Sequence, residues 1–140
     1  MEKLSLEQLA SYLPYELQVK ANDTVTPGVL VSICSGMAGL LLYEEKDEIE
    51  YYDLSEIKPL LIPLSECEKH LNVDSGLEID SSILTFNKYC NSINIYPDGS
   101  EWTHSIDVYN NIYVWLFKNH FDVFNLISKG LALNKLEYGN

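Results

Sequence analysis

The chain has 140 residues and a formal net charge of −12, and 46% of its residues are hydrophobic. A fold of this length buries about two-thirds of the surface of its unfolded chain, so the sequence predicts a single globular domain over residues 1–140. The hydrophobic content excludes a disordered acidic tail, and the negative charge disfavours direct binding to nucleic acid. All nine basic residues are lysines, so the bidentate arginine contacts to phosphate or guanine are absent.

The cysteines and the longest uncharged stretch bear on the compartment. Cys34, Cys67 and Cys90 are widely spaced and odd in number, which favours a reducing cytoplasm over a disulfide framework. We expect no secretion signal, because the first residues have no basic segment followed by an apolar run. Residues 24–43 carry no charge, but their glycines, proline and hydroxyl residues favour two strands around a turn over a membrane span.

The N-terminal residues predict a helix followed by a strand. Ser5 and Gln8 have the spacing of a capping box, so we expect a helix from Ser5 to Leu13 that ends before Pro14. In Leu17–Ala21, apolar and polar residues then alternate, which is typical of a half-buried strand.

The next forty residues continue as an antiparallel β-meander. Its expected strands are Val29–Cys34, Leu40–Glu44 and a segment with Ile49 and Tyr51. Two prolines, Pro59 and Pro63, bracket Leu60–Ile62, which we interpret as a short edge strand or an extended connector.

The second half has mainly helical signals. Ser65 and Glu68 predict a capped helix to about Leu71. The stretch Ser81–Cys90 is compatible with either a helix or a strand, and Pro97–Gly99 indicates the turn of a hairpin. Apolar residues at helical spacing then predict a helix over Asp107–Asn119.

The last helical signals lie near the C-terminus. We expect His120 to cap the end of that helix, and Asp122 to begin a short fourth turn that runs to Ser128. Gly130 occupies the position of a C′ glycine after this turn. The fold class predicted for the whole chain is therefore α+β: an antiparallel meander in the N-terminal half, packed against an N-terminal helix, a middle helix and C-terminal helices.

The acid residues are concentrated in one part of the chain. Residues 44–80 hold 12 of the 21 acids and 3 of the 9 lysines, a local net charge of −9. Five of these acids fall within seven residues: Glu44, Glu45, Asp47, Glu48 and Glu50. They are interpreted either as a solvated strand edge that prevents aggregation or as a docking surface for a basic partner. The spacing is not that of a calcium-binding loop.

No set of residues predicts catalysis or metal binding. Cys67 and His70 share one helix face, but a zinc site needs two further ligands at suitable spacing. Ser35–Gly36 lacks the flanking glycines of a nucleophile elbow, and His120 with Asp122 is better explained by helix capping. We therefore expect no catalytic residue, no cofactor and no metal, and we expect that the protein is not an enzyme.

A run of aromatic residues near the C-terminus covers more than one face of the predicted helix. Part of it must be core, and the remainder would form an exposed aromatic patch of the kind that anchors protein interfaces. We take Tyr113 and Phe117 as candidate partner-binding residues in this patch.

Three segments together resemble a known family. They are Leu6–Tyr15, Ile57–Ser65 and His120–Leu133. In this order they resemble a family of small uncharacterised proteins from phages, prophages and mobile elements of Bacteroides-type bacteria. Family members often have arginine where Ile62 stands and glycine where Asn125 stands. The resemblance implies a phage or mobile-element context and supplies no activity or catalytic residue.

These observations lead to one functional expectation with two alternatives. We expect a small acidic accessory protein in the cytoplasm of a host cell. It would act without catalysis, by contacting a host or phage protein, and this partner could be basic. The sequence leaves homo-oligomerisation open. The first alternative is a counter-defence or host-takeover protein whose acidic face mimics nucleic acid. The second is a hydrolase whose site the sequence does not reveal.

Overall fold

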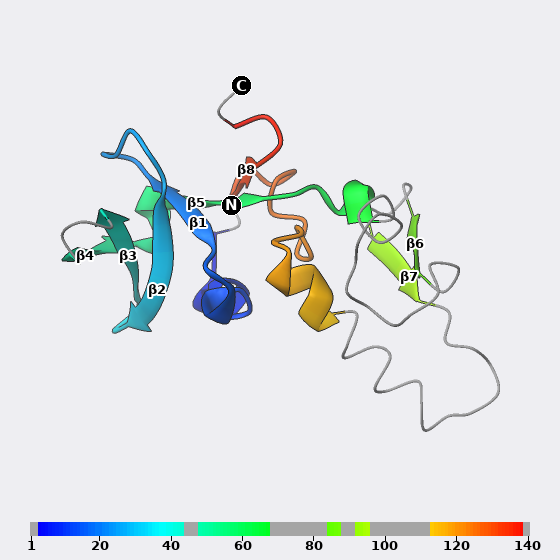
Figure 1. Cartoon of the computed structure of the whole chain (residues 1–140), viewed down its shortest axis with the longest axis horizontal. Coiled ribbons are helices and arrows are strands. Elements are labelled where there is room, and N and C mark those ends of the chain that lie inside the picture. The colour runs from blue at the N-terminus through cyan, green and yellow to red at the C-terminus, as the bar shows by residue number, and fades with distance from the viewer. Residues whose placement is uncertain (1–2, 44–47, 68–83, 88–91, 96–112, 139–140) are drawn as a thin grey trace. The chain divides into compact units, whose positions relative to one another are not determined.

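The computed structural model describes residues 3–43, 48–67, 84–87, 92–95 and 113–138 (Figure 1). The chain divides into two compact units, one of Met1–Leu61 with Leu126–Asn140 and the other of Ile62–Asn125. The first unit holds a six-stranded sheet, and short helices and a two-stranded sheet complete the described residues. This is a mixed α+β structure. The single-domain organisation and the packing of helices against the sheet stay predictions.

The N-terminal helix begins as the sequence predicts. The backbone N–H of Gln8 donates to Ser5 Oγ (3.2 Å), and the Ser5 N–H donates to Gln8 Oε1 (3.0 Å), which completes the capping box of α1 (Leu6–Ala10). The predicted extension to residue 13 is wrong. The helix ends at Ala10, and Pro14 lies in a separate 3-10 turn, η1 (Leu13–Tyr15), where its fixed φ and missing N–H are tolerated.

The sheet of the first unit has the strand order β4-β3-β2-β1-β5-β8. Its strands are β1 (Gln18–Ala21), β2 (Gly28–Cys34), β3 (Met37–Tyr43), β4 (Glu48–Asp53), β5 (Ile57–Leu61) and β8 (Leu133–Asn134). Strands β1 to β4 form the expected antiparallel meander. The sheet is mixed because β5 and β8 run parallel, a pairing that the sequence did not predict.

The prolines had indicated a short edge strand or an extended connector at Leu60–Ile62. Strand β5 instead lies inside the sheet, between β1 and β8. After β4 the 3-10 turn η2 (Leu54–Glu56) leads into β5, which pairs with β1 on one side and with β8 on the other. Pro59 stands opposite Val19 of β1, and pairing with β8 starts only at Leu60. The residue without an N–H therefore borders an unpaired stretch, which lets the proline stand inside the sheet.

The core of the first unit follows the alternation of the strands. Leu17, Val19 and Ala21 are fully buried, as expected, while Gln18 between them is exposed. The β2–β3 connection is a two-residue turn in which Ser35 has φ 52° and Gly36 has φ 78°. Two successive positive φ values match the right-handed twist of the flanking strands and make this a tight hairpin.

In the second unit, the middle helix begins differently from the prediction. Leu64–Glu66 form a single 3-10 turn, η3, and the Glu66 N–H donates to the carbonyl of Pro63 (3.0 Å). Pro63 is therefore the N-cap, and Ser65 lies inside the turn. The proposed capping partner Glu68 and the rest of the predicted helix lie outside the described residues.

Part of the ambiguous stretch 81–90 is a strand. Strand β6 (Leu84–Asn87) pairs antiparallel with β7 (Ser92–Ile95), with Leu84 opposite Ile95. The turn predicted at Pro97–Gly99 lies outside the described residues.

The third predicted helix is present over its described part, residues 113–118. His120 ends it, as expected, but through its backbone. His120 has φ 64°, its N–H donates to the Phe117 carbonyl (3.1 Å), and the N–H of Phe121 donates to that of Leu116 (2.9 Å). These two bonds form a Schellman motif with His120 at the C′ position that glycine usually takes.

The residues after this helix form turns. The prediction that helical structure continues from Asp122 to Ser128 is therefore wrong. Within the second unit, Ile62 donates to the His120 carbonyl and accepts from the Asp122 N–H, both at 2.8 Å, which bridges the two segments in parallel. In the first unit Gly130 has φ 75°. The bonds from Gly130 to Ile127 and from Leu131 to Leu126 repeat the Schellman pattern, which confirms Gly130 as a C′ glycine.

Candidate functional site

The candidate site is the outer face of β2, β3 and β4. In the β3–β4 register, Gly39 stands opposite Tyr51 and Leu41 opposite Ile49, so these four residues share one face. Ile49 and Tyr51 are 45% and 49% exposed, whereas Ala38 and Leu40 on the other face are fully buried. We call the face that carries Ile49 and Tyr51 the outer face, and the face that carries Ala38 and Leu40 the inner face. The outer face thus leaves two large apolar side chains side by side in solvent.

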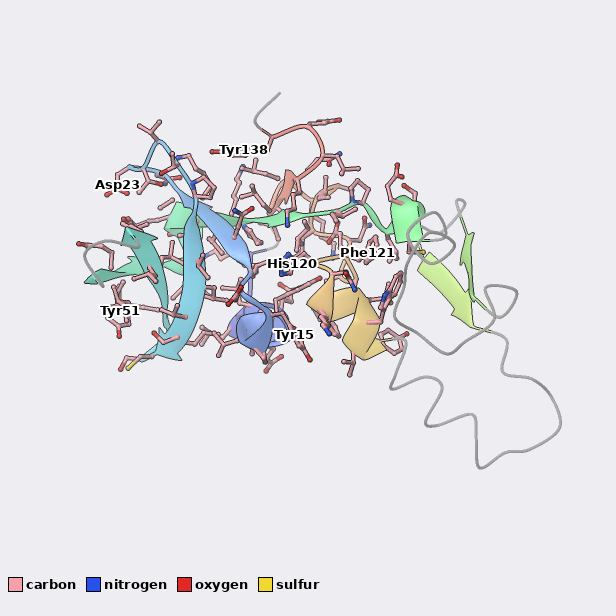
Figure 2. The ribbon with its side chains drawn as sticks, in the orientation of Figure 1. Tyr15, Asp23, Tyr51, His120, Phe121 and Tyr138 are labelled. Atoms are coloured by element: carbon pink, nitrogen blue, oxygen red, sulfur yellow. The ribbon has the colours of Figure 1, made fainter. Side chains whose placement is uncertain are left out.

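The ring of Tyr51 lies close to the Cα of Gly39, in space that a side chain at position 39 would fill. A Cβ built on Gly39 would lie 3.0 Å from Tyr51 Cε1, 3.1 Å from Ile49 Cγ2 and 2.3 Å from Ser32 Oγ. These three side chains therefore occupy the space above the glycine. Cross-strand aromatic cover of a glycine stabilises a sheet. Figure 2 shows Tyr51 at the end of the sheet formed by β2, β3 and β4.

Ser32 is covered by this arrangement. Its Oγ is a buried atom without a hydrogen-bond partner in the described part of the chain. A bulge between Leu30 and Ser32 brings the serine opposite Gly39. An unpaired buried hydroxyl lowers stability, so the close packing around Ser32 is accompanied by the loss of the hydrogen bonds that its hydroxyl would make in water.

The inner side of β4 has the opposite chemistry. Tyr52 is only 7% exposed, and its interaction with the Asp23 carboxylate favours the protonated phenol. Burial is the main reason why the pKa of Tyr52 rises to about 12, and the charges of Asp23, Glu50 and Glu56 raise it further. These three carboxylates therefore lie close enough to act together on one phenol, which makes this end of the sheet strongly negative.

The loop between β1 and β2 positions Asp23. Lys20 Nζ donates to the carbonyl oxygens of Ala21 and Thr24, and the Thr24 hydroxyl also donates to Ala21 (3.2 Å). The Asn22 N–H donates to the Glu56 carbonyl at 2.9 Å, which ties the loop to η2. The Lys20 ammonium group therefore satisfies two backbone carbonyl groups of this loop.

The acidic residues taken from the sequence are only partly described. Glu44, Glu45 and Asp47 lie outside the described residues, and Glu48 is the first residue of β4. Glu50 is exposed and stands opposite Leu40 at the end of the sheet. Of the five predicted acids, the structure thus places Glu50 beside the apolar pair of β4.

The predicted aromatic residues lie in the other unit. Tyr113 is 41% exposed, and Phe117 is half-buried with its ring centroid 5.7 Å from that of Phe124. Trp115 and Phe121 are buried and stack at 5.2 Å, so part of the aromatic run is core. The candidate residues therefore separate into two groups, one on β4 and one on the helical residues 113–118.

The chemistry available to the described residues is limited. Within those ranges, no group of three or more His, Cys, Asp or Glu side chains is arranged to hold a metal ion, and no helix is long and apolar enough to cross a membrane. Cys34 is exposed and Cys67 is buried, and both are thiols outside any disulfide. His70, which was predicted to share a helix face with Cys67, lies outside the described residues, as do Cys90 and His104.

The sequence contains a signal for the β4 site in the order of its residues, although their composition does not show it. In residues 48–51, apolar residues 49 and 51 alternate with acids 48 and 50, so one side of this part of the strand is apolar and the other acidic. The exposure of the apolar face follows from the position of β4 at the end of the strand order, which the sequence does not show.

Comparisons with family models, with curated proteins and with solved structures find no match to this chain.

Proposed function

We propose that this chain is a non-enzymatic protein-binding module whose contact surface is the outer face of β2–β4 with the acids at β4. The observation that carries the proposal is the pair Ile49 and Tyr51, each almost half exposed and adjacent on one strand. Exposed contiguous apolar residues with a charged border are typical of protein interfaces, and tyrosine is a frequent anchor in them.

The energetics favour a modest but specific contact. Completing the burial of Ile49 and Tyr51 supplies about 1 kcal/mol for each side chain. The ring of Tyr51 already rests over Gly39, so little side-chain freedom is lost when a partner covers it. An anchor that is ordered before binding converts a larger part of its buried area into affinity.

The charge at the same end of the sheet favours a basic partner. Asp23, Glu50 and Glu56 are exposed and lie around Tyr52. Carboxylates at the border of an apolar patch accelerate association with lysine- or arginine-rich surfaces and oppose acidic ones. We therefore propose a partner with an apolar contact flanked by positive charge.

The setting proposed for this interaction is the cytoplasm of a bacterial host, with the chain acting as a phage or mobile-element accessory protein. The resemblance of three segments to such proteins supports this context, and an exposed thiol at Cys34 suits a reducing compartment. We also propose that α1 covers the inner face of the sheet, which the burial of Leu9, Tyr12 and Leu40 supports.

A pull-down with a matched control tests the proposal. The bait carries Ile49→Thr and Tyr51→Thr, which remove apolar area and keep strand propensity. The control bait carries Val25→Thr, because Val25 is 91% exposed and lies on the β1–β2 loop. We expect host proteins captured by the wild-type chain to be lost with the double variant and kept with the control.

Three results would contradict the proposal. Equal capture by all three baits would show that the outer face is not the contact surface. A turnover activity that disappears on changing one polar residue would make the protein an enzyme. Capture of a DNA-binding protein that depends on Glu50 and on low salt, but not on Ile49 or Tyr51, would favour mimicry of nucleic acid instead.

A further inference from the structure

Strand β4 ends the strand order of the sheet. It pairs with β3 on one side, and in the described part of the chain no strand pairs with its other side. Ile49, Glu50, Tyr51 and Asp53 are all exposed along it. A strand edge with free N–H and C=O groups can pair with an extended segment of another chain.

We propose that β4 binds its partner by strand addition, and that the added strand alternates basic and apolar residues. This inference rests on the proposed binding function and names its mode and the chemistry of the partner. Main-chain hydrogen bonds to β4 would supply the pairing. Side chains of the added strand would contact the outer and the inner side of β4 in turn.

The alternation follows from the two sides of β4. Side chains on paired strands lie about 4.5–5.5 Å apart when they are directly opposite. Residues of the added strand on the outer side would meet Ile49 and Tyr51, so they should be apolar. Residues on the other side would meet Glu50 and the negative region made by Asp23 and Glu56, so they should be lysine or arginine.

Not every acid near β4 is available to a partner. Asp53 and Glu56 form the capping box of η2, in which the Leu54 N–H donates to Asp53 Oδ1 at 3.1 Å and the Asp53 N–H donates to Glu56 Oε1 at 3.2 Å. Glu50 has no such role among the described hydrogen bonds. We therefore assign to Glu50 the main contact with a basic side chain.

A second copy of this chain is the less favoured occupant. Pairing of β4 with β4 of another copy would bring Glu50 of one chain near Glu50 of the other. Like charges at such distances destabilise strand pairing, and acids on an exposed edge are a common protection against self-association. The same charge favours a strand that carries lysine or arginine at alternate positions.

The test uses synthetic eight-residue peptides and the full-length chain. The probe alternates lysine and valine, and its control has the same composition with four lysines followed by four valines. We expect the alternating peptide to bind about tenfold more tightly in a fluorescence anisotropy titration. Its affinity should fall with salt and with Glu50→Lys, and hydrogen exchange of β4 amides should slow when it binds.

N-methylated peptides separate strand addition from contact through side chains alone. Alternate N–H groups of a strand point to opposite edges, so methylation of the lysines and methylation of the valines block different edges. Strand addition predicts that one pattern abolishes binding and that the other keeps most of it. Equal effects of the two patterns, or equal binding of the alternating and block peptides, would overturn the inference.

The outcomes distinguish this inference from the function on which it rests. If the peptides fail but host proteins are still captured through Ile49 and Tyr51, strand addition is wrong and the binding function stands. If neither experiment depends on these residues, both are wrong. Slow exchange at β4 together with self-association of the chain in the absence of peptide would identify a second copy as the occupant and would also overturn the inference.

Discussion

The inner and outer faces of β2–β4 are both apolar, but they differ in what covers them. Leu30, Ala38 and Leu40 on the inner face are fully buried, whereas Ile49 and Tyr51 on the outer face are almost half exposed. Buried apolar side chains stabilise the fold through the area they remove from water. Exposed ones contribute less to folding, and the proposed function assigns Ile49 and Tyr51 to contact with a partner.

The largest expected effect comes from opening a cavity on the inner face. Leu40→Ala removes a fully buried side chain and should lower the free energy of unfolding by about 2–5 kcal/mol. Urea denaturation followed by fluorescence measures this loss. A loss below about 1 kcal/mol would show that the inner face is not the core, and the contrast between the two faces would disappear.

The second effect tests the polar end of the inner face through pH. Burial raises the pKa of Tyr52 to about 12, above the usual value of 10 that applies to the unfolded chain. The folded state therefore favours the protonated phenol. This contribution is fully present below pH 10 and is lost as the pH rises towards 12, by less than about 3 kcal/mol, because solvent screens the exposed carboxylates around the phenol.

Tyr52→Phe provides the control for this pH dependence. The variant cannot ionise at this position, so its stability should decline less between pH 10 and pH 12 than that of the wild-type chain. The measurement is the urea midpoint at each pH. Identical declines in the two proteins would mean that the environment of Tyr52, with its burial and its contact with Asp23, is not maintained in solution.

The third effect concerns the packing of the outer face. Gly39→Ala places a Cβ 2.3 Å from Ser32 Oγ and should destabilise the fold by about 1–3 kcal/mol. Ser32→Ala removes the buried hydroxyl that lacks a partner, so alone it should be neutral or slightly stabilising. In the Ser32→Ala background the cost of Gly39→Ala should be smaller. Strictly additive effects in this double-mutant cycle would contradict the contact.

The smallest effect on stability is expected from the exposed pair itself. Ile49→Thr with Tyr51→Thr places a β-branched residue at both positions and should lower the free energy of unfolding by about 1–2 kcal/mol in total, because about half of each side chain is already buried. The same urea experiment as for Leu40→Ala measures it. A loss as large as that of Leu40→Ala would show that the pair belongs to the core.

Local signals in the sequence were sufficient for much of the first unit. The capping box at Ser5, the alternation in Leu17–Ala21 and the glycine at position 130 depend only on neighbouring residues, and all three are present. The position of β5 between β1 and β8 depends on contacts between distant segments. Proline at position 59 indicated an edge, and only the register shows why it is tolerated inside the sheet.

The helix end at His120 shows a different limit. The sequence identified the position of the helix end but not its backbone conformation, because a positive φ is uncommon at residues other than glycine. The candidate site was predictable to the same degree. Glu50 and the alternation of β4 are readable in the sequence, whereas the exposure of Tyr51 over Gly39 requires the strand order.

We propose that the exposed apolar pair Ile49 and Tyr51 on β4 contacts a partner and contributes little to folding. The decisive measurement is titration of the alternating lysine–valine peptide into the Ile49→Thr, Tyr51→Thr variant, with Val25→Thr as the matched control. We expect an affinity at least about tenfold weaker for the double variant and unchanged for the control. Equal affinities for the wild-type chain and the double variant would contradict it.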